Sequence, residues 1–279
     1  MDNRPIGVFD SGVGGLTAVK ELRRLLPEES IVYFGDTARV PYGTKSRETI
    51  IKYAMQDIAF LLRHDVKMII AACGTVSSVL PDSVAARLPV AYTGVIPHAV
   101  HSACALSPHG RIGVIGTAAA VRSGSYGKLI RSTRPDAQVF GSACPLFVPL
   151  VENGIFEADN PIARLVAEQY LEPIKKEKVD TLILGCTHFP LLYSVINDVL
   201  EYQVTLIDPS KETARFAQRF LSENDMLSES GNQASCRYFV TDMPEGFAAV
   251  AEKIMGMDLY GAVTQVEIEE CPGELAELP

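Results

Sequence analysis

Two apolar runs of the same pattern constrain the fold of this chain more than any other feature. Residues 66–73 (Val-Lys-Met-Ile-Ile-Ala-Ala-Cys) and residues 179–186 (Val-Asp-Thr-Leu-Ile-Leu-Gly-Cys) each read as a buried strand that leads into a cysteine. A short polar turn follows both cysteines. Open α/β sheets keep their ligand crevices at the carboxyl ends of the strands. We therefore expect Cys73 and Cys186 at such positions, one in each half of the chain.

Strand and helix patterns alternate from the start of the chain. Residues 6–10 and 31–36 read as short buried strands. Residues 16–26 and 50–62 place their apolar side chains at helical spacing, and Pro27 ends the first of these helices. This alternation predicts an α/β fold with mostly parallel sheets that are flanked by helices.

The same pattern then starts again. Residues 112–117 repeat the pattern of residues 6–11 at an offset of 106, and the two cysteine runs repeat at an offset of 113. Two similar offsets in the same order predict an internal duplication of about one hundred residues. The alternative is that all buried parallel strands look alike, because they are runs of valine and isoleucine. We expect two similar α/β domains that arose by internal duplication and are related by pseudo-twofold symmetry.

Composition excludes several classes of protein. A net charge of −9 argues against a broad nucleic-acid surface, and no run of the 279 residues is long and apolar enough to span a membrane. The start of the chain lacks a signal-peptide pattern, so we expect a cytoplasmic protein. The six cysteines form no CxxC pair, which disfavours a metal site or a disulfide framework. Four are expected to be buried and inert: Cys104, Cys144, Cys236 and Cys271.

Residues 10–15 (Asp-Ser-Gly-Val-Gly-Gly) follow the first strand and open the first helix. Glycines there expose backbone amides at a helix start, where anions bind. The spacing is neither GxGxxG nor a phosphate loop with its lysine, so a carboxylate ligand is favoured over a nucleotide. Ser11 would then donate to the carboxylate. The alternative is that Asp10 and Ser11 only cap the helix.

The remaining polar residues near strand ends can each be interpreted in two ways. Pro41-Tyr42-Gly43 either lines the crevice or forms an ordinary turn. Asp36 and Glu152 have a functional interpretation, in which they orient a base or bind an ammonium group. The alternative is that both are solvated surface carboxylates. His188 follows Cys186 by two residues, so a turn brings its imidazole near the thiol, unless it serves as a structural hydrogen-bonding group. Residues 222–235 read as a loop, and residues 264–279, with five glutamates, as a frayed acidic tail.

Taken together, these segments resemble the bacterial glutamate racemases over about residues 5–215. The residues that carry the resemblance are 10–15, 33–36, 41–43, the run into Cys73, and 184–191 (Leu-Gly-Cys-Thr-His-Phe-Pro-Leu). The resemblance implies a two-base mechanism without a cofactor, in a cleft between the domains. One thiolate removes the α-proton of glutamate while the opposite thiol protonates the other face. Cys73 would serve the D-enantiomer and Cys186 the L-enantiomer, and the product would supply D-glutamate for peptidoglycan.

The resemblance also assigns residues and boundaries. It implies four catalytic residues: Cys73, Cys186, His188 and Asp10. The implied substrate-binding set is Asp10, Ser11, Pro41, Tyr42, Gly43, Gly74, Thr75, Thr117, Thr187 and His188. Asp36 and Glu152 would be carboxylates near the two bases. We expect no metal and no cofactor, a first domain of residues 1–97 and 207–279, and a second domain of residues 98–206. The expected partner is glutamate, without a membrane or nucleic acid; a homodimer is left open.

Two positions depart from the family pattern. Gly74 stands where the family has asparagine, and Ala120 where it often has threonine. Both changes remove polar side chains, which favours a related racemase for another acidic amino acid such as aspartate. The sequence also leaves open a binding protein of the same fold, like the family members that restrain DNA gyrase, and a dithiol redox protein. The redox hypothesis fails if the thiols flank a substrate, because a disulfide needs Cα atoms within about 7 Å. The chain starts almost at its first strand, so we expect no regulatory N-terminal extension.

Overall fold

The computed structural model describes residues 1–229, 231 and 234–268, and these fall into two compact units. Unit 1 takes residues 1–95 and the described residues from 213 onward, and unit 2 takes residues 96–212. The predicted domain boundaries lie near these positions without matching them. The second one was expected after residue 206, whereas the units divide inside the helix Pro209–Glu223.

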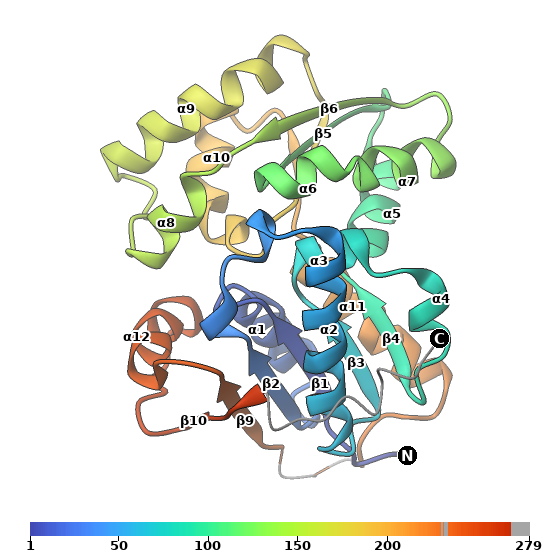
Figure 1. The fold of residues 1–279 in the computed structure, drawn as a ribbon. Coiled ribbons are helices and arrows are strands. Elements are labelled where there is room, and N and C mark those ends of the chain that lie inside the picture. The colour runs from blue at the N-terminus through green and yellow to red at the C-terminus, as the bar shows by residue number, and fades with distance from the viewer. Residues whose placement is uncertain (230, 232–233, 269–279) are drawn as a thin grey trace. The chain divides into compact units, whose positions relative to one another are not determined.

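Unit 1 is built on a six-stranded sheet in the order β10-β9-β2-β1-β3-β4, in which every neighbouring pair is parallel (Figure 1). Its strands are β1 (Ile6–Asp10), β2 (Ile31–Gly35), β3 (Met68–Ala71), β4 (Ala91–Gly94), β9 (Cys236–Val240) and β10 (Val263–Gln265). The central three strands are buried along their whole length, as expected for a parallel sheet that is covered on both faces.

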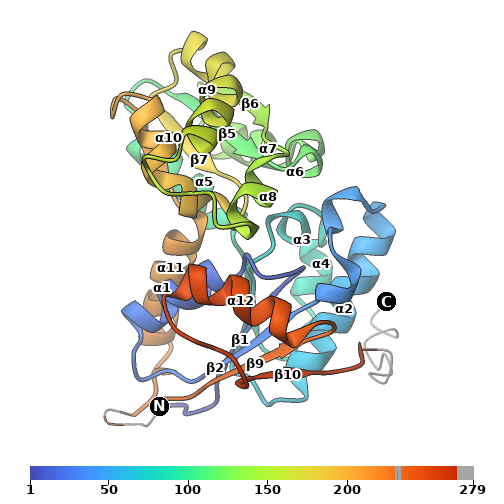
Figure 2. The same cartoon turned by 90° about the vertical axis from the view of Figure 1, so that its left-hand side faces the viewer.

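Helices cover both faces of this sheet. They are α1 (Leu16–Leu25), α2 (Arg47–Leu62), α3 (Gly74–Val79), α4 (Asp82–Ala85), α11 (Pro209–Glu223) and α12 (Pro244–Met255), with the 3-10 turns η1 (Thr37–Arg39) and η2 (Tyr42–Thr44). The apolar stripe of α2 packs on Phe9, Phe34 and Ile69. Side chains alternate along a strand, so Tyr33 points to the other face. There its ring lies 5.8 Å from that of Phe247 in α12, beside α1 (Figure 2).

Unit 2 has a four-stranded parallel sheet in the order β6-β5-β7-β8. Its strands are β5 (Arg111–Gly116), β6 (Gln138–Ala143), β7 (Thr181–Leu184) and β8 (Thr205–Ile207). Its helices are α5 (Ile96–Leu106), α6 (Ala118–Ser123), α7 (Ser125–Thr133), α8 (Phe147–Glu152), α9 (Pro161–Lys176) and α10 (Tyr193–Val199), with η3 (Phe189–Leu192). Two separate apolar clusters fill the two faces, because alternate side chains of β7 enter each of them.

The two sheets share one topology and one register. The order β2-β1-β3-β4 in unit 1 repeats as β6-β5-β7-β8 in unit 2. Ile6 pairs with Met68, and its counterpart Ile112 pairs with Thr181. Cys73 and Cys186 each lie five residues beyond these β3 and β7 partners, so they are equivalent. The α/β class with two similar parallel sheets is therefore confirmed.

The chain after α11 returns to unit 1. Strand β9 pairs with β2, and β10 pairs with β9. The prediction of a frayed tail from residue 264 is therefore wrong for Thr264 and Gln265, which lie in β10, while residues 269–279 lie outside the described residues. The predicted loop of residues 222–235 likewise begins too early, because α11 continues to Glu223.

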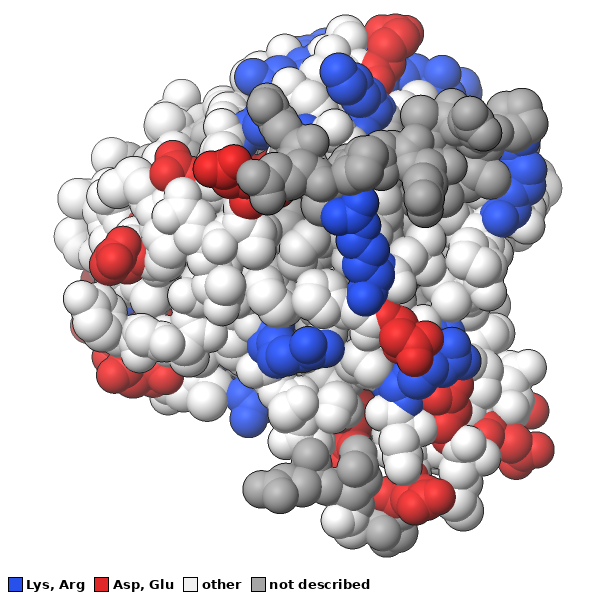
Figure 3. Space-filling model, turned by 60° about the horizontal axis from the view of Figure 1, so that its bottom comes forward, with Lys and Arg blue, Asp and Glu red and all other residues white. Residues whose placement is uncertain are grey.

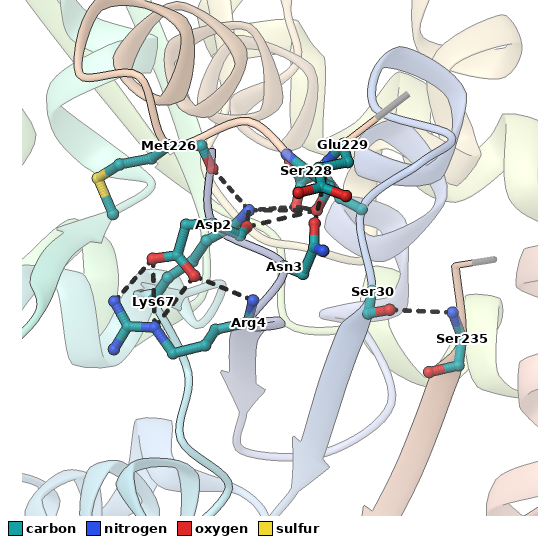
Figure 4. Close-up of polar contacts among 10 residues, drawn as sticks. Asp2, Asn3, Arg4, Ser30, Lys67, Met226, Ser228, Glu229 and Ser235 are labelled. Carbon is teal, nitrogen blue, oxygen red and sulfur yellow. Dashed lines mark hydrogen bonds and ion pairs between the residues drawn. The ribbon is translucent and has the colours of Figure 1, made fainter. Parts of the chain in front are cut away.

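A fully buried lysine, Lys67, bonds to the segment that returns to unit 1 (Figure 4). The Nζ of Lys67 lies 2.5 Å from Oε2 of Glu29 and donates to the carbonyl oxygens of Asp2 and Met226 at 2.6 and 2.7 Å. The other Glu29 oxygen accepts from the backbone N–H of Ser228 at 2.8 Å. Lys67 is thereby bonded to groups from three separate segments of unit 1, so its charge is compensated in the core.

Figure 3 shows basic and acidic side chains interspersed on one face of the molecule. Within the described ranges, no helix is long and apolar enough to cross a membrane, and no three His, Cys, Asp or Glu side chains are grouped to hold a metal ion. Cys144 is buried as expected, but Cys104 and Cys236 are only half-buried, which corrects that prediction. Cys271 lies outside the described residues.

Candidate active site

The Cys73 thiol lies at the carboxyl end of the unit 1 sheet, between β3 and the start of α3. Its side chain is buried, and its Sγ lies 3.6 Å from the hydroxyl oxygen of Ser11. Burial, followed by the negative charge of Asp10, raises the pKa of the Cys73 thiol to about 12. This group therefore rests as a thiol at neutral pH and needs local assistance to act as a base.

Asp10 organises the glycine loop beside Cys73. Its Oδ2 accepts from the backbone N–H groups of Gly12 and Gly15 at 3.3 and 3.0 Å, and its side chain is buried. A Cβ on Gly15 would lie 2.6 Å from that of Asp10, so only glycine allows this close approach. Asp10 thus holds the start of α1, while the Ser11 hydroxyl faces the thiol. Asp10 therefore bonds the loop that leads into α1, whose N-cap residue is Gly15, and Ser11 is the residue of this loop that lies at the thiol.

The loop after β2 presents Pro41 at the surface and Gly43 half-buried, but it turns the Tyr42 hydroxyl inward. That hydroxyl contacts Oδ2 of Asp36 and lies 2.9 Å from Oδ2 of Asp57 in α2. Asp36 also bonds to Arg39 at 2.5 Å and to Thr241 at 3.0 Å.

Asp10 is the carboxylate whose charge raises the pKa of Cys73, and the expected place of Asp36 near this thiol stays a prediction. Asp36 anchors the loop. The first residues of α3, Gly74 and Thr75, follow Cys73 directly and are buried.

Cys186 in unit 2 has a different set of neighbours. Its Sγ lies 3.8 Å from Nδ1 of His188, and Nε2 of the same ring lies 3.1 Å from Oε1 of Glu152 at the end of α8. The thiol and the imidazole are buried, and Glu152 is partly exposed. A carboxylate on Nε2 fixes the tautomer with a proton there, which makes Nδ1 the nitrogen that can accept the thiol proton.

Two threonines lie at the same end of the unit 2 sheet. Thr117 caps α6, because its hydroxyl oxygen accepts from the N–H of Ala120 at 3.2 Å. In the shared register Thr117 corresponds to Ser11, each five residues after a paired isoleucine. Thr187 is buried next to Cys186. The structure thus gathers the expected residues into two groups, one in each unit, at equivalent strand ends.

Sequence reasoning missed Arg39, Asp57 and Thr241, which hold the loop of Tyr42. One signal was present for Asp57: it interrupts the apolar face of α2 between Ala54 and Ile58. An acidic residue on the buried stripe of a helix indicates a polar partner in the core. Nothing in the local pattern distinguished Arg39 or Thr241 from surface residues.

Comparisons with known proteins identify the family. The model of the Asp/Glu/hydantoin racemase family matches residues 15–217 of this chain. A glutamate racemase from Geobacter metallireducens is 44% identical over 96% of this chain and 98% of its own length. This chain belongs to the glutamate racemase family. Another glutamate racemase, from Chlorobaculum tepidum, is 45% identical over 91% of this chain and 93% of its own length.

Solved racemase structures share the fold. The glutamate racemase of Francisella tularensis, in complex with D-glutamate, has a TM-score of 0.88 at 40% identity, covering 97% of this racemase and 100% of that chain. The Thermus thermophilus glutamate racemase, bound to β-chloro-D-alanine, has a TM-score of 0.85 at 43% identity, covering 97% and 100%. An aspartate racemase from Picrophilus torridus, at 17% identity and a TM-score of 0.57, shares the fold alone.

Proposed function

We propose that this chain interconverts L- and D-glutamate without a cofactor, and that Cys73 and Cys186 are its two bases. The observation that carries the assignment of the bases is their equivalence: both are buried thiols at the same register position of two parallel sheets. Racemisation at a carbon acid needs an acid and a base on opposite faces of the carbon, and two such thiols fit that requirement. That the two units present them to one substrate in a cleft stays a prediction.

In this mechanism the thiols exchange protonation states in each turnover. From D-glutamate, the Cys73 thiolate takes the α-proton, the electron pair of the C–H bond stays on carbon, and the Cys186 thiol delivers a proton to the opposite face. From L-glutamate the roles are reversed. The loss of the thiol proton is assisted in unit 2 by Nδ1 of His188, which Glu152 holds, and in unit 1 by the Ser11 hydroxyl. Donors that stabilise the developing negative charge would come from the predicted substrate-binding set.

The proposal includes a cellular role. D-glutamate would be supplied for peptidoglycan, and we infer the cytoplasm as the compartment. The five cysteines among the described residues are all free, which fits a reducing compartment. A homodimer stays a prediction that sedimentation velocity of the purified chain tests.

The deciding experiment follows the circular dichroism of L-glutamate and then D-glutamate with purified protein and no cofactor. We expect the signal to decay to zero from both sides, and in D2O the product to carry deuterium at the α-carbon. Cys73→Ala and Cys186→Ala should each abolish racemisation, whereas Cys104→Ala, at a half-buried thiol away from both strand ends, should not. Full racemisation by either of the first two variants would refute the two-thiol assignment.

A second substrate is favoured by one observation. Gly74 and Ala120 remove polar side chains from the expected pocket, which points to another acidic amino acid such as aspartate. A panel of L-amino acids in the same assay separates the two substrates. Faster loss of signal with L-aspartate than with L-glutamate would make these two positions determinants of specificity.

A further inference from the structure

A buried polar cluster connects the loop of Tyr42 to helix α2. It consists of Asp36, Arg39, Tyr42 and Asp57, and both carboxyl side chains are fully buried. Asp57 occupies the middle of α2, on a face that is otherwise apolar. A buried carboxyl in such a place is costly unless it is paired, so its partners indicate its role.

Arg39 bridges the two sides of the cluster. Its Nε donates to Asp36 at 2.5 Å, its Nη2 to Asp57 at 3.2 Å and its Nη1 to Gln56 at 2.5 Å. The guanidinium also lies 4.0 Å from the ring centroid of Tyr53. All three nitrogens are thus engaged by side chains of the β2 end and of α2, which ties η1 to that helix.

The Tyr42 hydroxyl lies between the two carboxyl groups and has only one proton to donate. It contacts Oδ2 of Asp36 and lies 2.9 Å from Oδ2 of Asp57, so one of these oxygens must itself carry a proton. Burial and the negative charge of Asp36 raise the pKa of Asp57. The arrangement that satisfies all three groups has a neutral Asp57 donating to Tyr42 and Tyr42 donating to the Asp36 carboxylate, whose charge Arg39 compensates.

The loop that carries Tyr42 also forms hydrogen bonds with the segment that follows β9. Thr241 donates to Oδ1 of Asp36 at 3.0 Å and accepts from the N–H of Ala38 at 2.8 Å. Thr37 donates to the carbonyl oxygen of Asp242 and accepts from its N–H, at 2.7 and 2.8 Å. The loop is therefore held from two elements that are far apart in the sequence.

This loop adjoins the Cys73 group. A Cβ built on Gly12 would lie 3.2 Å from Cγ2 of Val40, which places the loop against the residue that follows Ser11. The Tyr42 ring belongs to the same apolar cluster as Cys73, and η2 lies beside α3. A shift of the loop would therefore move the surroundings of both Ser11 and the thiol.

We propose that Asp57 is a positioning residue of this racemase: in its neutral form it holds Tyr42, and with Arg39 and Thr241 it fixes residues 36–44 against Ser11 and Cys73. Tyr42 then acts through the placement of its loop, because its hydroxyl is used within the cluster. The inference rests on the proposed function for its kinetic test, and on Cys73 reactivity for a test that needs no turnover.

The kinetic test compares two substitutions at one position. Asp57→Asn keeps an N–H to donate to Tyr42 and an oxygen to accept from Arg39, so kcat/KM should stay within about threefold of the wild type. Asp57→Leu removes both and should lower kcat/KM about 10- to 100-fold, mainly through a higher KM for both enantiomers. Asp65→Asn, at an exposed carboxyl just beyond α2, is the matched control and should change neither constant.

The second test measures alkylation of Cys73 by iodoacetamide, read by mass spectrometry of its peptide. Asp57→Leu should change the rate at least about threefold, and Asp57→Asn and Asp65→Asn should not. A wild type that fails to racemise glutamate, with this alkylation pattern intact, refutes the proposed function and leaves the positioning role standing. The inference would be overturned if folded Asp57→Leu had the KM and the Cys73 alkylation rate of the wild type. It would also be overturned if Asp57→Asn lost as much kcat/KM as Asp57→Leu.

If Asp57→Leu does not fold, substitutions of Thr241 test the inference instead. Thr241→Val keeps the shape but removes both hydrogen bonds of the hydroxyl, and it should raise KM and change Cys73 alkylation in the same direction on a smaller scale. Thr241→Ser restores the hydroxyl and should return both readouts to wild-type values. A folded Thr241→Val with wild-type KM and alkylation would also overturn the inference.

Discussion

The charge of a neighbouring carboxylate acts on the Cys73 thiol. Asp10 contributes, after burial, to the raised pKa of about 12 of this group. Asp10→Asn keeps an oxygen that can accept from Gly12 and Gly15 but removes the charge, so the pKa of Cys73 should fall and its thiolate fraction should rise at any pH below that value. We expect alkylation of Cys73 at pH 9 to become about two- to tenfold faster. Asp225→Asn, at an exposed carboxyl, is the control, and an unchanged pH–rate profile in Asp10→Asn would contradict the prediction.

Cys186 lies beside the imidazole of His188, which in turn contacts Glu152. Glu152→Gln removes the charge that favours protonated His188, so proton transfer from the thiol becomes harder, and kcat/KM should fall about 10- to 100-fold. The decrease in kcat/KM must be the same for L- and D-glutamate, because the equilibrium constant between the two enantiomers is one. Progress curves from L- and D-glutamate measure it, with Glu157→Gln as the exposed control. If Glu152→Gln has the kcat/KM of the wild type, the Glu152 carboxylate takes no part in the mechanism.

At the residue level, sequence reasoning found the groups that follow strand ends, and missed those placed by tertiary contacts. Cys73, Cys186 and His188 were identifiable because their strands are local patterns. The bond of Asp36 to Thr241 was not predictable, because Thr241 is 205 residues away in the chain. No local rule connects positions at that separation.

At the level of elements, Gly185 shows how closely a strand end is packed. A Cβ there would lie 2.7 Å from the carbonyl oxygen of Ile115 in β5, a backbone atom that cannot move aside. Gly185→Ala should therefore displace the end of β7, destabilise the protein by about 1–3 kcal/mol and shift the neighbouring Cys186.

Urea unfolding and racemase activity of the same preparation check this prediction. Gly246→Ala in α12 is the matched control, since its Cβ would meet only Met243 at 3.7 Å, and alanine in a helix should be neutral or slightly stabilising. Equal stabilities of the two variants would show that the strand end tolerates a side chain.

The strands and helices themselves were largely predictable. Runs buried on both faces, such as residues 6–10 and 68–71, carry an uninterrupted apolar signal. Strand β10 was not recognised because its three residues, Val-Thr-Gln, lie next to acidic residues, and only the valine is partly buried. Its strand character comes from pairing with β9, and a pairing partner is not a property of the segment itself.

At the level of the whole molecule, Lys67 joins the first residues of the chain to the segment that returns after α11. Lys67→Met would leave Glu29 buried without its positive partner, which should lower the free energy of unfolding by about 3–5 kcal/mol. Lys52→Met, at an exposed position of α2, should change it by less than about 0.5 kcal/mol. Urea titrations followed by circular dichroism give both values.

Adding Glu29→Gln to Lys67→Met should recover part of the loss, because the orphaned carboxylate is then neutral. If Lys67→Met unfolds at the urea concentration of the wild type, the buried pair does not hold the returning segment.

Because unit 2 interrupts unit 1 between β4 and the later part of α11, the order of synthesis on the ribosome matters for unit 1. Strand β2 ends at Gly35, but its neighbour β9 starts at Cys236, about 200 residues later. At roughly 5–20 residues per second, that interval lasts on the order of 10–40 s. Throughout it, one side of β2 has no strand to pair with, while every strand of unit 2 has already been made by its end. The nascent chain therefore exposes an open sheet edge for most of its synthesis, and this is the stage at which a chaperone would have most to protect.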